Sequence, residues 1–143
     1  MALLNLAGAR PADLGVGDGG RLRPCPEGAS HCVVSQYPGS GREPARSHIH
    51  PFRYSGPAGE AMTRLLAVLL QQPRCVLVTT TPTYVHAEFR SARLGFIDDV
   101  EFQLSQAESV IHVRAASRIG IGDLGTNRAR LEELREAFDA FDE

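Results

Sequence analysis

The chain has 143 residues, 43% of them hydrophobic and 22% charged, which is the composition of one globular domain with a single core. Its net charge of −2 provides no basic field that would favour nucleic acid as a partner. All 15 basic residues are arginine, which excludes mechanisms that need a lysine amine, such as Schiff-base chemistry.

Membrane and targeting segments are not evident in the sequence. No apolar run approaches the roughly 20 residues that a membrane-spanning helix needs. The start, MALLNLAGARP, has no basic segment of the kind that precedes a cleaved signal. We therefore expect no transmembrane segment and a cytoplasmic location for the chain as given.

Residues 1–55 form a stretch rich in Gly, Pro and Ser, which we call the arm. Neither a helical nor a strand period persists in it. A structureless segment of this length is uncommon inside a compact domain. We expect the arm to lie extended over the folded part, residues 56–143, with a loosely ordered lead as the alternative. Its expected anchors are Leu14, Leu22, Val33, Ile49 and Phe52.

The first helix is predicted over residues 57–72. Pro57 suits the first helical position, and Ser55 or Gly56 can cap the helix. Pro73 ends it. Its apolar stripe contains Ala61, Leu65, Val68 and Leu69, widened by Met62 and Leu66.

Four strands follow, predicted over residues 74–80, 84–90, 99–104 and 110–116. Their connections are short enough for antiparallel neighbours. Alternation places one apolar row on a common face: Val85, Ala87, Phe89, Val100, Phe102, Leu104, Ile111, Val113 and Ala115. The opposite row, which we call the polar sheet face, contains Tyr84, His86, Glu88, Arg90, Asp99, Glu101, Gln103, His112 and Arg114.

The last element is an amphipathic helix over residues 125–141, with Leu131, Leu134, Phe138 and Phe141 at helical spacing. Asp123 or Thr126 can cap its start. The predicted fold is therefore α+β with two layers. A four-stranded antiparallel meander has one face covered by a helix before it and a helix after it, and the arm completes a single domain.

The polar sheet face supplies the candidate catalytic residues, namely His86, Glu88, Glu101 and His112. If the strands pair in a suitable register, these groups converge into an acid–base set or a set of metal ligands. The alternative is a ladder of opposite charges on a solvated face. If the arm covers this face, the charges are partly buried and must be paired.

The turn before the last helix, SRIGIGDLGTNR, matches a dinucleotide fingerprint literally. That fingerprint needs a second parallel strand after the helix, and the pattern of this chain contains none. A glycine-rich turn into a helix N-terminus between Arg118 and Arg128 can instead bind an anion. The candidate ligand-binding residues are Arg114, Arg118, Gly120, Asp123, Asn127 and Arg128. The alternative is that Asp123 caps the helix and pairs with an arginine.

Three cysteines fit neither a disulfide-dense scaffold nor a zinc module. Cys25 and Cys32 can form a disulfide in an oxidising compartment and are free thiols in a reducing one. Cys75 begins a strand that faces the core, where we expect it to pack. We expect no metal and no cofactor.

Four segments in this order resemble one known family: LGVGDGGRLRPCPEGASHCVVSQ, YVHAEFRS, FIDDVEF and IHVRAASRIGIGDLGTNRARLEELR. The chain is similar to the domain-of-unknown-function family fourteen ninety-nine, found in bacteria, cyanobacteria and plant plastids. The likeness runs from about Leu14 to the last helix. His31 stands where we expect Asn, and Gly122 where we expect a hydroxyl residue. The resemblance implies a fold but no reaction, and it implies that relatives carry upstream targeting or membrane segments.

Three classes of function follow from these patterns. The leading hypothesis is a non-catalytic accessory or ligand-binding domain that holds a small anionic group or a protein partner. The second is a hydrolase-like enzyme that works through His86, Glu88 and Glu101, with or without metal. The third is a docking module of a membrane-associated complex, in which the arm makes the contact.

Overall fold

The computed structural model describes residues 8–28, 30–38, 46–119 and 125–141. An antiparallel meander is formed by β3 (Cys75–Thr80), β4 (Tyr84–Arg90), β5 (Ile97–Ser105) and β6 (Val110–Ser117). Within the described residues the sheet has the order β1-β6-β5-β4-β3, and β2 also pairs with β6. The α+β antiparallel fold predicted from the sequence is therefore confirmed.

Two of the six strands come from the arm and were not predicted. They are β1 (Cys32–Val34) and β2 (Phe52–Arg53), and both pair with the outer edge of β6. Segments of three and two residues are too short for an alternating pattern to stand out from the surrounding loop. Their pairing covers an edge that would otherwise expose the backbone of β6.

The meander begins one residue later than predicted, because Arg74 has a φ of 54° and lies in the left-handed region. A backbone in that conformation reverses the chain after the first helix and cannot belong to a strand. The third predicted strand is longer than expected and begins at Ile97.

Both helices form where their apolar spacing predicts, as α1 (Ala58–Leu70) and α2 (Thr126–Ala140). Their caps differ from the prediction. Pro57 is itself the N-cap residue of α1, in an extended conformation, and its carbonyl accepts the Ala61 N–H. Gly125 is the N-cap residue of α2, and its φ of 83° suits glycine. Asp123 lies outside the described residues. Neither of these helices is long and apolar enough to cross a membrane.

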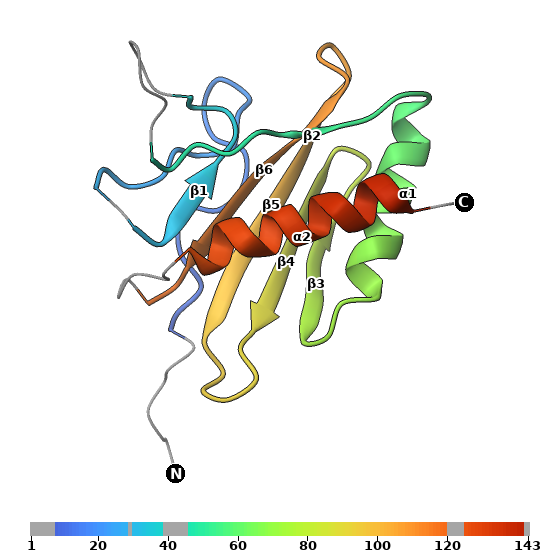
Figure 1. Ribbon diagram of the computed structural model, residues 1–143. Coiled ribbons are helices and arrows are strands. Elements are labelled where there is room, and N and C mark those ends of the chain that lie inside the picture. The colour runs from blue at the N-terminus through green and yellow to red at the C-terminus, as the bar shows by residue number, and fades with distance from the viewer. Residues whose placement is uncertain (1–7, 29, 39–45, 120–124, 142–143) are drawn as a thin grey trace.

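The predicted apolar row faces both helices, as expected. In Figure 1, α2 crosses the front of the sheet and α1 lies beside β3. The buried cluster joins Val85, Phe102 and Val113 of the sheet to Leu65 of α1 and Phe138 of α2. The arm adds buried side chains to the same cluster, namely Val33, Ile49 and Phe52. The arm is thus part of the core on this side of the sheet.

Replacing Phe102 with alanine should lower the free energy of unfolding by about 3–5 kcal/mol, because the ring is fully buried and its removal leaves a cavity. Val76→Ala is the control, since Val76 is 60% exposed on the edge strand and should change stability by no more than about 0.5 kcal/mol. Urea unfolding measures both values. Equal effects would contradict the assigned orientation of the sheet.

Candidate functional site

The polar sheet face is covered by the first part of the arm. Residues 8–24 run behind the sheet in Figure 1 and form hydrogen bonds to its side chains. Glu101 and Arg114 are only 0% and 1% exposed. Because a charge removed from water is costly unless it is paired, each of these groups needs a partner within the protein. The other buried polar groups of this face are His86, Asp99 and His112.

Asp99 is the centre of a first ion-pair cluster. Its carboxylate accepts hydrogen bonds from His86 Nε2 at 2.7 Å and from the Arg118 guanidinium at 2.8 and 3.0 Å. Arg118 also donates to Glu88, and Arg10 of the arm donates to the same Glu88 oxygen at 2.8 Å. This cluster joins the start of the arm to β4 and β5.

The charges in this cluster hold both carboxyl groups in the ionised form. Burial by itself raises the pKa of Asp99, but the hydrogen bonds and charges of His86 and Arg118 outweigh it and lower that pKa below its usual value. Burial likewise raises the pKa of Glu88, and Arg10 with Arg118 reverse the effect. Neither carboxyl group retains a proton at neutral pH that it could donate as a general acid.

The same cluster contains three potential metal ligands, His86, Glu88 and Asp99, whose ligand atoms lie within 4.8 Å of one another. Arg118 donates to both carboxylates, so a guanidinium lies where a divalent cation would have to bind. A metal could enter only if Arg118 moved, which would leave a charge without a partner in a buried place. These residues fit an ion-pair cluster better than a metal centre.

Glu101 is the centre of a second cluster. It accepts hydrogen bonds from the Gly15 N–H at 2.6 Å and from the Tyr84 hydroxyl, and it lies 3.5 Å from Arg114 Nη1. Arg114 Nη2 donates to Asp13 of the arm at 2.8 Å. Burial and the bond to Glu101 raise the pKa of Tyr84, so its hydroxyl stays a donor.

The four predicted catalytic residues are not brought together in one site. His86, Glu88 and Glu101 are neighbours on β4 and β5, but each is held by an ion pair or a hydrogen bond under the arm. His112, on β6, contacts a serine and a glutamate outside both clusters. A shared acid–base role for the four residues stays a prediction that this arrangement does not support.

The predicted ligand-binding set is divided between the two faces of the sheet. Arg114 and Arg118 lie in the ion-pair clusters, and their charge is neutralised there. Asn127 and Arg128 belong to α2, on the opposite face. Two further predicted ligands lie outside the described residues, Gly120 and Asp123.

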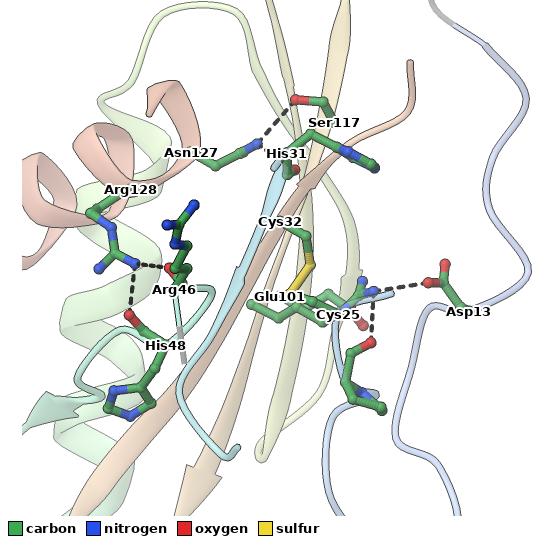
Figure 2. The surroundings of a disulfide bond; sticks show 12 residues. Asp13, Cys25, His31, Cys32, Arg46, His48, Glu101, Ser117, Asn127 and Arg128 are labelled. Carbon is green, nitrogen blue, oxygen red and sulfur yellow. Dashed lines mark hydrogen bonds and ion pairs between the residues drawn. A yellow bond between two sulfur atoms is a disulfide. The ribbon is translucent and has the colours of Figure 1, made fainter. Parts of the chain in front are cut away.

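Asn127 and Arg128 attach the start of α2 to the arm. Asn127 donates to the His31 carbonyl at 3.0 Å. Arg128 donates to the carbonyls of Arg46 and His48 at 2.8 and 2.7 Å. Figure 2 shows the two contacts of Arg128, and it shows Asn127 donating to the Ser117 hydroxyl at 3.0 Å. Among the described residues, Arg128 donates to these two backbone oxygens and pairs with no carboxylate.

Cys25 and Cys32 are joined by a disulfide, with their Cα atoms 5.7 Å apart. Figure 2 shows the bond beside β1, with Arg46 and Arg128 on one side and Asp13 on the other. A pocket of about 580 Å³ opens next to it, and we call it the disulfide pocket. It is lined by both cysteines, Arg46, Arg128 and the loop around Glu27.

Sequence reasoning did not identify the arm residues that close the polar sheet face. Arg10, Asp13 and Gly15 supply a cation, an anion and a backbone N–H to three different groups of the sheet. The charges of ARPAD complement Glu88 and Arg114 in sign, and this complementarity was the available signal. It does not specify a partner, because many arginines and acids are present in the chain.

The ion-pair clusters should make stability depend on acid pH. The folded pKa of Asp99 lies below its unfolded value of about 3.9, so this contribution is complete above that value and is lost as pH falls through the folded pKa. Urea unfolding between pH 7 and pH 3 should show stability falling below about pH 4. Asp99→Asn should be less stable at pH 7 and show a shallower fall. The exposed Asp139→Asn should behave like the unaltered protein, and an unchanged slope in Asp99→Asn would contradict the assignment.

The disulfide can be counted directly. Without reductant, denatured protein should contain one alkylatable thiol, that of Cys75, and three after reduction. Burial raises the pKa of Cys75 to about 11, so the native thiol should react slowly at neutral pH. Reduction should lower the free energy of unfolding by roughly 2–3 kcal/mol for so short a loop. Three thiols before reduction, measured by mass spectrometry, would show that the bond is not formed.

Comparison with known proteins places the chain in a family. A family model described as Protein of unknown function (DUF1499) matches residues 21–138. The matched segment runs from the arm, before β1, into the last turns of α2. No protein with a curated description matches the chain significantly. The chain therefore belongs to the DUF1499 family, whose members are proteins of unknown function.

Proposed function

We propose that this protein is a ligand-binding domain that holds an anionic group in the disulfide pocket, between Arg46 and Arg128. The observation that carries the proposal is an unbalanced pair of cations. Both arginines line one pocket of about 580 Å³, and neither forms an ion pair with a carboxylate of the described residues. Glu27 is the one acidic residue among the described residues that line this pocket, and it forms no ion pair with either arginine.

The position of Arg128 favours recognition of an oxyanion. Two backbone carbonyls fix its Nη2 at 2.8 and 2.7 Å, so little side-chain freedom remains to be lost on binding. A guanidinium has five N–H donors, so others remain for a ligand. Next to it, the pKa of His48 is lowered by burial and by the charges of His50 and Arg128, which is consistent with a positive local field.

The arginines of the polar sheet face are less suited to binding an external anion than those of the disulfide pocket. Arg114 and Arg118 were also expected to bind an anion, but Asp13, Glu101, Asp99 and Glu88 already neutralise them. An external anion would have to displace the arm and these carboxylates. Arg46 and Arg128 form no ion pair with a carboxylate of the described residues, although Glu27 lines the same pocket.

Inorganic phosphate is a suitable probe for this site. At ten times its dissociation constant, a ligand of the folded state stabilises the protein by about 1.4 kcal/mol. We expect phosphate to raise the melting temperature at constant ionic strength, and Arg46→Gln and Arg128→Gln to reduce that shift. Scanning fluorimetry measures the shift, and titration calorimetry measures the binding itself.

The matched control is Arg93→Gln, because Arg93 is exposed on the loop between β4 and β5. Arg46 is also exposed, so its replacement should leave the fold intact. An equal phosphate shift in Arg46→Gln, Arg128→Gln and Arg93→Gln would overturn the proposal.

A further inference from the structure

Three side chains that belong neither to the ion-pair clusters nor to the disulfide pocket form a hydrogen-bonded chain of their own. Ser35 Oγ lies 2.9 Å from His112 Nδ1, and His112 Nε2 lies 2.9 Å from Glu108 Oε1. Ser35 follows β1, His112 is on β6, and Glu108 is in the turn before β6. The three residues line one pocket of about 480 Å³, which we call the Ser35 pocket.

The Ser35 hydroxyl is held by the backbone next to the histidine. The Val113 N–H donates to Ser35 Oγ at 2.9 Å, which leaves the hydroxyl proton available to His112 Nδ1. In the tautomer of His112 that has its proton on Nε2, Nδ1 accepts from Ser35 and Nε2 donates to the Glu108 carboxylate. A histidine placed between a hydroxyl and a carboxylate in this way can serve as the general base for a serine nucleophile.

Ser35 is held by the backbone at the wall of the Ser35 pocket. Ser35 is 5% exposed and is held by a second backbone bond, from its own N–H to the Val113 carbonyl at 2.9 Å. The Glu108 side chain is 61% exposed and reaches the pocket from the solvent side. The hydrogen bond from His112 is the main cause that lowers the pKa of Glu108, so its carboxylate is ionised.

We infer that Ser35, His112 and Glu108 form a nucleophilic centre that hydrolyses small carboxylic esters in the Ser35 pocket. This activity goes beyond the proposed anion binding and does not depend on it. The pocket volume suits a small substrate. Arg21 also lines the pocket, with its guanidinium over the Tyr37 ring at 4.7 Å, and its positive charge would favour an oxyanion formed in the pocket.

The reaction balances with these groups and water alone. Ser35 Oγ attacks the ester carbonyl carbon while its proton passes to His112 Nδ1. The bond between that carbon and the alcohol oxygen then breaks, and the leaving oxygen takes the proton from His112. Water next attacks the acyl-serine and gives a proton to Nδ1, which returns it to Ser35 as the acid leaves. Glu108 keeps its charge throughout and stabilises the imidazolium.

A fluorophosphonate probe and p-nitrophenyl acetate test this inference on the full chain. We expect the probe to form a covalent adduct that peptide mass spectrometry locates at Ser35. Ser35→Ala should abolish both the fluorophosphonate adduct and the hydrolysis of p-nitrophenyl acetate. The exposed Ser55→Ala is the control and should retain both.

Ser35 also holds the backbone of Val113, so Ser35→Ala could unfold the protein for a structural reason. Glu108→Gln avoids this problem because Glu108 lies in an exposed turn. It should melt within a few degrees of the unaltered protein and react with the probe roughly tenfold or more slowly. Folded protein that forms no adduct at Ser35, or Glu108→Gln that reacts at an unchanged rate, would overturn the inference.

Discussion

Arg114 and Arg118 lie beneath the arm on the polar sheet face, and the rest of this side of the protein depends on how their charge is compensated. Arg114 is paired with Glu101 of β5 and Asp13 of the arm, while Arg118 is paired with Asp99 and Glu88. Removing one partner from a buried ion pair is strongly destabilising, because the remaining charge is left without compensation. The arm can therefore lie here only in a register that brings its own charges and N–H groups to these positions.

The disulfide and the two short strands restrict the arm to that register. Cys32 belongs to β1, so the bond to Cys25 fixes the segment that precedes β1 close to the edge of β6. Farther along, Phe52 is buried against Phe102 and Phe138 on the opposite face, with ring centroids 6.0 and 5.6 Å away. The first part of the arm thus covers the polar sheet face, and its second part contributes side chains to the core on the opposite face. The sheet is therefore covered by the helices on one face and by the arm over β4, β5 and β6 on the other, while Val76 of the edge strand β3 stays exposed.

The side chains that remain available for binding or chemistry therefore lie away from the centre of the sheet. The middle of the polar face is occupied by paired charges, and the groups that remain available lie along β1, where the arm turns. The disulfide pocket lies beside Cys32, and the Ser35 pocket begins three residues later. The first pocket contains cations without carboxylate partners among the described residues. The second contains a hydroxyl, an imidazole and a carboxylate in sequence. Each site combines a residue of a regular element, Arg128 of α2 or His112 of β6, with residues of the neighbouring loops.

The two layers of this protein can be predicted from its amino-acid sequence, because the patterns that specify them are local. Alternation placed Val85, Phe102 and Val113 on the buried face, and helical spacing placed Leu65 and Phe138 opposite them. The partners of the charged residues, in contrast, are apparent only in the folded protein. Arg10 meets Glu88 across 78 positions, and Ser35 meets His112 across 77. No periodic pattern in the sequence relates residues so far apart. A charged group or a hydroxyl can also pair with many different groups, so its type does not identify its partner. The path of the arm selects one partner for each, and that path follows from burial and pairing in the folded chain as a whole.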